Sequence, residues 1–225
     1  MPSNKFRWLT NFFAPPKGTQ MDLTRRSVLT AGIAGLGGGL LFSAQPAVAK
    51  RNLNPALLRP PGSLPEEDFL SKCIRCGECM KVCPTNAIQP AMLESGLQGM
   101  WSPLLTMRQG YCEYKCNMCT QVCPTGAIAK LPLEKKQTTK IGLAMVDKNR
   151  CVAYAYGKEC RLCRDHCPLS DKAINLVEAS VMVGTKMLTI KQPQVDSKLC
   201  IGCGICENKC PVEGQSAIRV MSIQV

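Results

Sequence analysis

Cysteine is the residue type in this chain whose number and spacing point most directly to chemistry. All sixteen cysteines fall into four groups of four, and each group ends with the spacing C-x2-C-x3-C followed by proline. The groups are Cys73, Cys76, Cys79 and Cys83; Cys112, Cys116, Cys119 and Cys123; Cys151, Cys160, Cys163 and Cys167; Cys200, Cys203, Cys206 and Cys210. With the closing prolines, motifs one to four span 73–84, 112–124, 151–168 and 200–211. One cysteine-rich unit is therefore repeated along the chain.

Three kinds of chemistry compete for these thiols: disulfide bonds, structural zinc and iron-sulfur clusters. A disulfide framework gives no reason to fix a proline after every fourth cysteine. Structural zinc favours two separated C-x2-C pairs, often with histidine, whereas this chain has only His166. The run C-x2-C-x2-C-x3-C-P is that of bacterial ferredoxins, in which the fourth cysteine ligates a different cluster from the first three. We therefore predict four [4Fe-4S] clusters, with all sixteen cysteines as ligands.

Motifs two and three depart from the regular spacing in their first gap. This gap has three residues in motif two (CEYKC) and eight in motif three (CVAYAYGKEC). The entropic cost of closing a loop grows only with the logarithm of its length. We therefore expect the first cysteine of each of these motifs, Cys112 and Cys151, to reach its cluster. The alternative is that Cys112 or Cys151 is not a ligand, which would leave a three-iron or degenerate site.

The exchange of fourth cysteines means that the motifs act in pairs. We expect the regular motifs one and four to form one pair and motifs two and three the other, so that Cys83 ligates the cluster of Cys200, Cys203 and Cys206. The alternative pairs motif one with two and motif three with four. The gaps between motifs are long enough for either path.

Short strands and helices must position these loops. Apolar stretches ending in polar turns precede motifs three and four, in IGLAMVDKNRC (141–151) and LTIKQPQVDSKLC (188–200), and a short apolar piece follows each closing proline. Each repeat thus predicts a strand, the cysteine loop, a short helix and a strand. Gly77, Gly202 and Gly204 lie between cysteines, where such loops require positive φ. We predict an α+β fold of two ferredoxin-like lobes, each holding two clusters.

The net charge of +12 is explained by the predicted clusters. Removal of residues 1–49 leaves 23 basic and 15 acidic residues, a charge of +8, and four oxidised clusters of about −2 each would balance it. The basic residues inside the cysteine runs either stabilise the clusters or are solvated surface charges; they are Lys81, Lys115, Arg161, Arg164 and Lys209. No second feature supports nucleic-acid binding, and no catalytic constellation is visible.

Residues 1–49 predict a leader for export. Arg25 and Arg26 lie in a T-R-R-x-x-L twin-arginine pattern, an apolar stretch follows at 28–42, and residues 47–49 supply small side chains for cleavage. The alternative, a membrane-spanning helix, needs about twenty apolar residues, more than this stretch offers. The twin-arginine route carries folded proteins, so clusters would be inserted before transport.

Cleavage would leave residues 50–225 as a polyferredoxin domain in the periplasm. An uncleaved leader or a membrane-bound partner would instead hold the protein at the membrane. Met1 and Met21 are both possible starts, and residues 1–20 would be either an extension of the leader or a mis-assigned segment.

Three stretches resemble the ferredoxin-type proteins of the NapG/MauM family: RPPGSLPEEDFLSKCIRCGECMKVCP (59–84), CVAYAYGKECRLCRDHCP (151–168) and CIGCGICENKCP (200–211). The resemblance runs from about Arg59 to the C-terminus and includes the twin-arginine leader. It implies an exported electron relay with four [4Fe-4S] clusters, found with periplasmic nitrate reductase or methylamine dehydrogenase systems. It also implies a membrane quinol-oxidising partner with its own iron-sulfur motifs.

These observations predict an electron carrier rather than an enzyme. We expect it to relay electrons from a membrane-bound quinol dehydrogenase to a periplasmic reductase, directly or through a c-type cytochrome. The alternative is a maturation factor for a periplasmic redox enzyme. A purely structural role is disfavoured because four clusters exceed what stability requires. Reversible reduction would distinguish a relay from a maturation factor.

Overall fold

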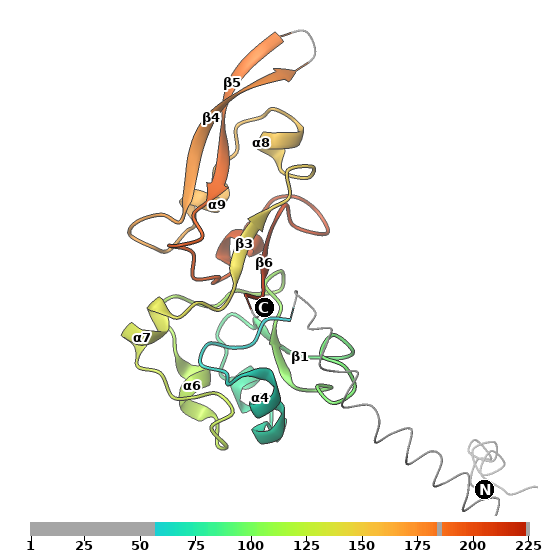
Figure 1. The fold of residues 1–225 in the computed structure, drawn as a ribbon, viewed down its shortest axis with the longest axis vertical. Helices are drawn as coiled ribbons and strands as arrows, with labels where there is room; N and C mark the ends of the chain where they lie inside the picture. Colours follow the sequence, from blue (N-terminus) through green and yellow to red (C-terminus); the bar gives the residue numbers. More distant parts are fainter. Residues whose placement is uncertain (1–56, 184–185, 224–225) are drawn as a thin grey trace, which may run out of the picture. The chain divides into compact units, whose positions relative to one another are not determined.

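The computed structural model describes residues 57–183 and 186–223 (Figure 1). The predicted leader at 1–49 and its cleavage site lie outside the described residues. The described residues belong to one compact unit. None of the helices in this part of the chain is long and apolar enough to cross a membrane.

The described chain combines short helices with strands, two of which are ten residues long, and this agrees with the predicted α+β class. In chain order they are α4 (Glu66–Lys72), α5 (Glu78–Lys81), β1 (Ile88–Pro90), β2 (Pro103–Leu105), α6 (Met118–Val122), α7 (Leu133–Thr138), β3 (Leu143–Val146), α8 (Val152–Ala155), α9 (Leu162–Asp165), β4 (Ile174–Val183), β5 (Lys186–Val195), α10 (Ile205–Asn208) and β6 (Ile218–Met221).

The helix of each repeat lies inside the cysteine run rather than after the proline, so the expected order of elements was wrong. Helices α5, α6, α9 and α10 each contain the third cysteine of a motif. The spacing C-x3-C matches one helical turn and places the third and fourth cysteines on neighbouring turns. Gly77 and Gly204 precede α5 and α10 with φ of 78°, which confirms the predicted need for positive φ.

The strands repeat one pairing plan in the two halves of the chain. Within each half, the strand after the first motif pairs with the strand before the second. Thus β1 pairs antiparallel with β2 between motifs one and two. The ten-residue strands β4 and β5 pair in the same way between motifs three and four, and form the orange hairpin of Figure 1.

A second pairing closes each half, because the segment before the first motif meets the segment after the second. In the second half β3 pairs antiparallel with β6, with Leu143 opposite Met221. In the first half the same contact is an antiparallel bridge between Ser63 and Ile128. Sequentially adjacent motifs are therefore held together by backbone hydrogen bonds.

The hydrophobic core is small and contains cysteine. One buried cluster joins Phe69, Ile88, Ile128, Ile174 and Ile218 with aliphatic neighbours from both halves. The cysteines buried in the same cluster are Cys79, Cys167, Cys200 and Cys206. Aromatic residues make up only 5% of the chain, and Phe69 is the only aromatic among its largest fully buried side chains in the described residues. The thiols thus lie where an ordinary domain would place apolar side chains.

Candidate metal centres

The structure gathers the sixteen thiols into four sets, each drawn from two motifs. In the first half, the Cys79 thiol interacts electrostatically with Cys73, Cys76 and Cys123, and we name this set group one. Group two is Cys112, Cys116 and Cys119 with Cys83. In both sets, three cysteines of one motif are joined by the fourth cysteine of its neighbour.

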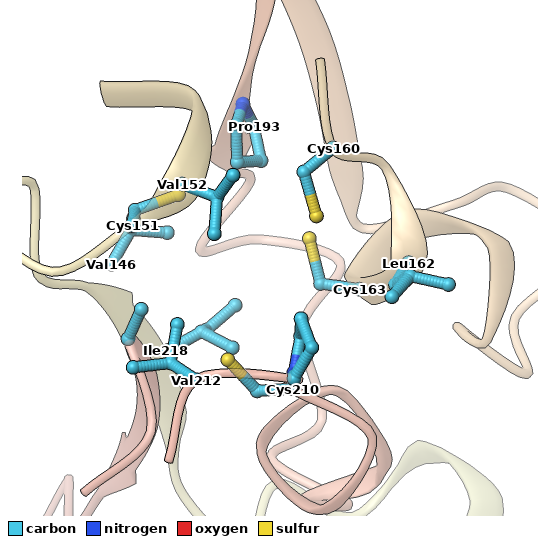
Figure 2. Close-up of a pocket in the computed structure, with 12 residues that line it drawn as sticks. Val146, Cys151, Val152, Cys160, Leu162, Cys163, Pro193, Cys210, Val212 and Ile218 are labelled. Atoms are coloured by element: carbon cyan, nitrogen blue, oxygen red, sulfur yellow. The ribbon is translucent and has the colours of Figure 1, made fainter. Parts of the chain in front are cut away.

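The second half holds two apolar cavities lined by thiols. One contains Cys200, Cys203 and Cys206 together with Cys167, and is named group three. The other contains Cys151, Cys160, Cys163 and Cys210, and is named group four (Figure 2). Valine, leucine, isoleucine, alanine and proline side chains supply the rest of the group four lining. Groups three and four have the same crossed composition as groups one and two.

The nested pairing of motifs one and four was therefore wrong, and the adjacent pairing is observed. Cys83 lies with the thiols of motif two, and Cys167 rather than Cys83 completes the set of motif four. The β1–β2 and β4–β5 pairings give the physical reason. In each antiparallel pair the chain leaves one motif along the first strand and comes back along the second, so that the next motif lies beside the one before it.

Both irregular cysteines join a group. Cys151 precedes α8, and the Tyr154 hydroxyl in that helix donates to the carbonyl oxygen of Pro193 in β5 at 3.1 Å. This contact holds the segment between Cys151 and Cys160 against the β4–β5 hairpin. Cys151 lies in the group four cavity. Cys112 is fixed differently, because its backbone N–H donates to the carbonyl oxygen of Cys203 at 2.8 Å.

The four groups follow one another in a single order. Cys119 of group two interacts electrostatically with Cys79 of group one. Cys203 of group three interacts with Cys112 of group two, and Cys206 of group three interacts with Cys163 of group four. Groups one, two, three and four are therefore neighbours in that sequence, and the contact between Cys112 and Cys203 joins the two halves.

The donor set fits an iron-sulfur cluster. Among the described residues, no three Cys, His, Asp or Glu side chains converge closely enough to hold a single metal ion. A cubane makes a different demand, because each of its four irons takes one thiolate and the sulfurs must surround a volume. Figure 2 shows the group four thiols around such a volume. Each group would hold one cluster through its four sulfur atoms.

Comparisons with known proteins also indicate iron-sulfur binding. A 4Fe-4S binding domain profile matches residues 68–89, and a 4Fe-4S dicluster domain profile matches residues 158–213. The MauM methylamine utilization ferredoxin-type protein of Methylorubrum extorquens is 38% identical over 209 residues, covering 92% of this chain and 90% of the relative. The ferredoxin-type protein NapG of Escherichia coli is 35% identical over 215 residues, covering 94% and 89%. The chain belongs to the NapG/MauM family of ferredoxin-type proteins. This confirms the resemblance predicted from the sequence. Because ferredoxin-type proteins are electron carriers, the chain is an electron carrier rather than an enzyme.

Burial makes free thiolates unfavourable in this NapG/MauM-type protein. It is the main cause that raises the pKa of four thiols to about 12, with repulsion from neighbouring thiolates adding to it; they are Cys79, Cys119, Cys163 and Cys203. Burial likewise raises the pKa of Cys206 well above its ordinary value. A positively charged metal can offset this cost, because metal ligands must be deprotonated.

Hydrogen bonds more than offset the effect of burial on the pKa of the fourth cysteines of motifs one and two. Burial tends to raise the pKa of Cys83, but hydrogen bonds from Thr85 and from backbone amides lower it below its ordinary value. The same balance lowers the pKa of Cys123, which accepts from the backbone N–H of Ile128 at 3.4 Å. Threonine follows the closing proline in these two motifs, and leucine or valine takes that place in motifs three and four.

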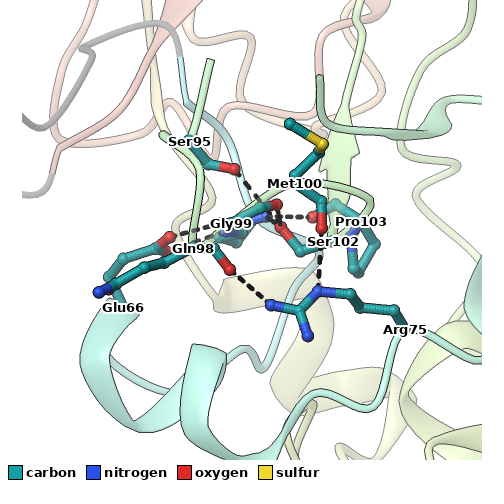
Figure 3. A network of polar contacts seen from close by, with 9 residues as sticks. Glu66, Arg75, Ser95, Gln98, Gly99, Met100, Ser102 and Pro103 are labelled. Carbon is teal, nitrogen blue, oxygen red and sulfur yellow. Dashed lines mark hydrogen bonds and ion pairs between the residues drawn. The ribbon is translucent and has the colours of Figure 1, made fainter. Parts of the chain in front are cut away.

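Solvent reaches the groups unequally. Of the sixteen cysteines, all of which the structure describes, Cys76 of group one is the only exposed one. The loop beside it is held in place, because the Arg75 guanidinium donates to the carbonyl oxygens of Gln98 at 2.5 Å and Met100 at 2.9 Å (Figure 3). Group one, the first in the series of groups, is therefore the group with a solvent-exposed thiol, that of Cys76.

The basic residues predicted near the clusters are mostly solvated. Lys81 and Arg161 are exposed and pair with Glu78 at 3.0 Å and Asp165 at 3.1 Å. Two basic residues outside the motifs, which were not predicted from the sequence, contact the cysteine loops. Arg108 donates to the carbonyl oxygen of Cys210 at 2.9 Å, and Lys136 is buried beside group two. Neither has a motif signal, because long-range packing brings both to the site.

Proposed function

We propose that this chain relays electrons through four [4Fe-4S] clusters, one in each thiol group, with each pair of adjacent motifs forming a ferredoxin-like lobe. Such clusters supply one-electron transfer when bound. The observation that carries the proposal is the unbroken order of groups one to four. A storage or structural role would not require the two halves to be joined at Cys112 and Cys203.

The chain's own residues would set the spacing and surroundings of the clusters. The hydrogen bond between Cys112 and Cys203 fixes the distance between the halves. The apolar side chains that line groups three and four would lower the local dielectric constant around bound clusters. Arg108 anchors the loop after β2 to the last motif through the carbonyl oxygens of Cys210 and Val212.

A relay needs two partners, and we propose that they dock at the two ends of the order. Group one has the exposed Cys76, and Leu162 beside the group four cavity is 40% exposed. We propose a membrane-bound quinol dehydrogenase with iron-sulfur motifs as donor, and a periplasmic reductase or c-type cytochrome as acceptor. Such interfaces are typically below about 1,200 Å², and we expect weak, salt-sensitive association.

Export is part of the proposal. The twin-arginine pattern at Arg25 and Arg26 supports a periplasmic location, with clusters inserted before transport. Replacement of both arginines by lysine should leave the precursor in the cytoplasm with its clusters in place. Normal processing of that variant in the periplasm would contradict this location.

The relay is tested by deleting the chain and measuring quinol-dependent reduction of the terminal reductase. The same reductase is assayed separately with an artificial electron donor. Full activity with the artificial donor, combined with loss of quinol-dependent activity, is the result expected of a relay. A reductase that stays inactive because it lacks its own cofactor would instead identify a maturation factor.

A further inference from the structure

Lys136 is a buried cation beside group two. It lies in α7, where only 1% of its surface is exposed, whereas its neighbours Glu134 and Lys135 are exposed. Its ammonium donates to the carbonyl oxygen of Glu113, and to that of Tyr114 at 3.3 Å. Desolvation of a cation is costly, and two neutral carbonyl groups do not cancel its charge.

No carboxylate balances this charge in the part of the chain that the structure describes. The ion pairs found there belong to Arg59, Lys81 and Arg161. The two carbonyl groups that Lys136 contacts come directly after Cys112, and its ammonium also faces the Cys112 thiol. A cluster held by the thiolates of group two would therefore supply the negative charge that Lys136 lacks.

The other cations near the cysteine loops differ from Lys136 in burial. Lys81 and Arg161 are exposed and already paired with carboxylates. Lys172 donates to the carbonyl oxygen of Cys167 but is only partly buried. Solvent and salt screen exposed charges much more than buried ones. Lys136 is thus the cation whose field acts on its thiol group with the least screening.

We propose that Lys136 raises the reduction potential of the cluster bound by Cys83, Cys112, Cys116 and Cys119, by stabilising its reduced state. Reduction adds one electron from a redox partner and no proton, so the negative charge increases by one beside a fixed positive charge. Group two adjoins the contact between the halves at Cys112 and Cys203, so its potential would affect electron transfer across that contact. The proposal rests on the cluster binding contained in the proposed function.

The test is an EPR-monitored redox titration of the full chain, purified without oxygen. Lys136→Met removes the charge and the hydrogen bonds, Lys136→Gln removes the charge but keeps a donor, and Lys136→Arg keeps the charge. Lys135→Met is the matched control, because Lys135 lies in the same helix and is exposed. Dithionite serves as reductant and ferricyanide as oxidant, so no physiological partner is needed.

We expect one of the four midpoint potentials to fall in Lys136→Met and Lys136→Gln. The expected shift is at least a tenfold change in the reduction equilibrium, about 59 mV for one electron. The potentials of Lys136→Arg and Lys135→Met should stay near that of the unaltered protein. The shift should persist in high salt because the charge is buried.

Four unchanged potentials in Lys136→Gln or Lys136→Met would overturn the proposal. If the Met variant fails to assemble this cluster, the Gln and Arg variants decide: a lower potential in Lys136→Gln alone supports the proposal, and equal potentials in the two overturn it. Failure of the Gln, Met and Arg variants alike would show that the site needs the shape of lysine, and would also overturn it. None of these results depends on the relay partners, so the outcome is separate from the test of the relay.

Discussion

The backbone N–H of Cys112 donates to the carbonyl oxygen of Cys203 across a distance of 2.8 Å. The two residues are 91 positions apart in the sequence, and they belong to thiol groups two and three. This hydrogen bond joins the half of the chain built from motifs one and two to the half built from motifs three and four. Groups one and two of the first half and groups three and four of the second half therefore form one series.

The adjacent pairing predicts which cysteines share a cluster. Cys83→Ser and Cys116→Ser should each remove one cluster, about four irons, and the double variant should lose no more than either single variant. Combining Cys83→Ser with Cys203→Ser should instead remove two clusters, about eight irons. Iron analysis of the purified variants provides the measurement. An additive loss in the first pair and a single loss in the second would restore the nested pairing.

Metal content provides a second prediction. Because all sixteen cysteines lie in one of the four groups, protein purified without oxygen should contain about sixteen irons and sixteen sulfides per chain. We expect chelation of the iron to unfold the chain, because a small core would depend on bound clusters for its stability. About twelve irons would mean that one irregular motif fails, and zinc without sulfide would contradict the assignment of the centres.

Two glycines with similar positive φ should respond differently to replacement by alanine. Gly77 and Gly202 have φ of 78° and 71°, but a Cβ at Gly77 meets nothing within 4 Å, whereas one at Gly202 would lie 2.4 Å from Gly142. Gly77→Ala should lower the free energy of unfolding by about 1–2 kcal/mol, because alanine is strained in the left-handed conformation. Gly202→Ala should carry the same strain and lose about 1–3 kcal/mol more, because its Cβ would overpack against Gly142.

Thermal unfolding of the two variants, with iron content measured alongside, checks this difference. The larger loss should fall on Gly202→Ala and reduce the occupancy of group three, because Gly202 separates two of its cysteines. Equal stability of the two variants would mean that the backbone near Gly142 yields, and that Gly202 is needed only for its φ.

Local sequence patterns were sufficient to predict the repeated motifs, the class of fold and the role of Gly77 and Gly204. These features depend on spacing within about a dozen residues, where ligand geometry and turn conformation act directly. The strand before motif three and the strand before motif four were also predicted, and they are β3 and β5. Gly202 likewise has the predicted positive φ.

Features that depend on long-range packing were predicted wrongly or missed. The gaps between motifs fit either pairing by length, and only the β1–β2 and β4–β5 strand pairs decide between them. Lys136 follows Pro132 in an ordinary polar stretch, and tertiary packing of α7 turns it inward. The sequence shows its charge but not its burial.

Whether this chain relays electrons through a series of four clusters can be measured by a coulometric redox titration of the anaerobically purified protein. We expect reversible uptake of about four electrons per chain, one for each thiol group, with full recovery on reoxidation. Uptake of fewer electrons by fully loaded protein, or reduction that destroys the clusters, would contradict it.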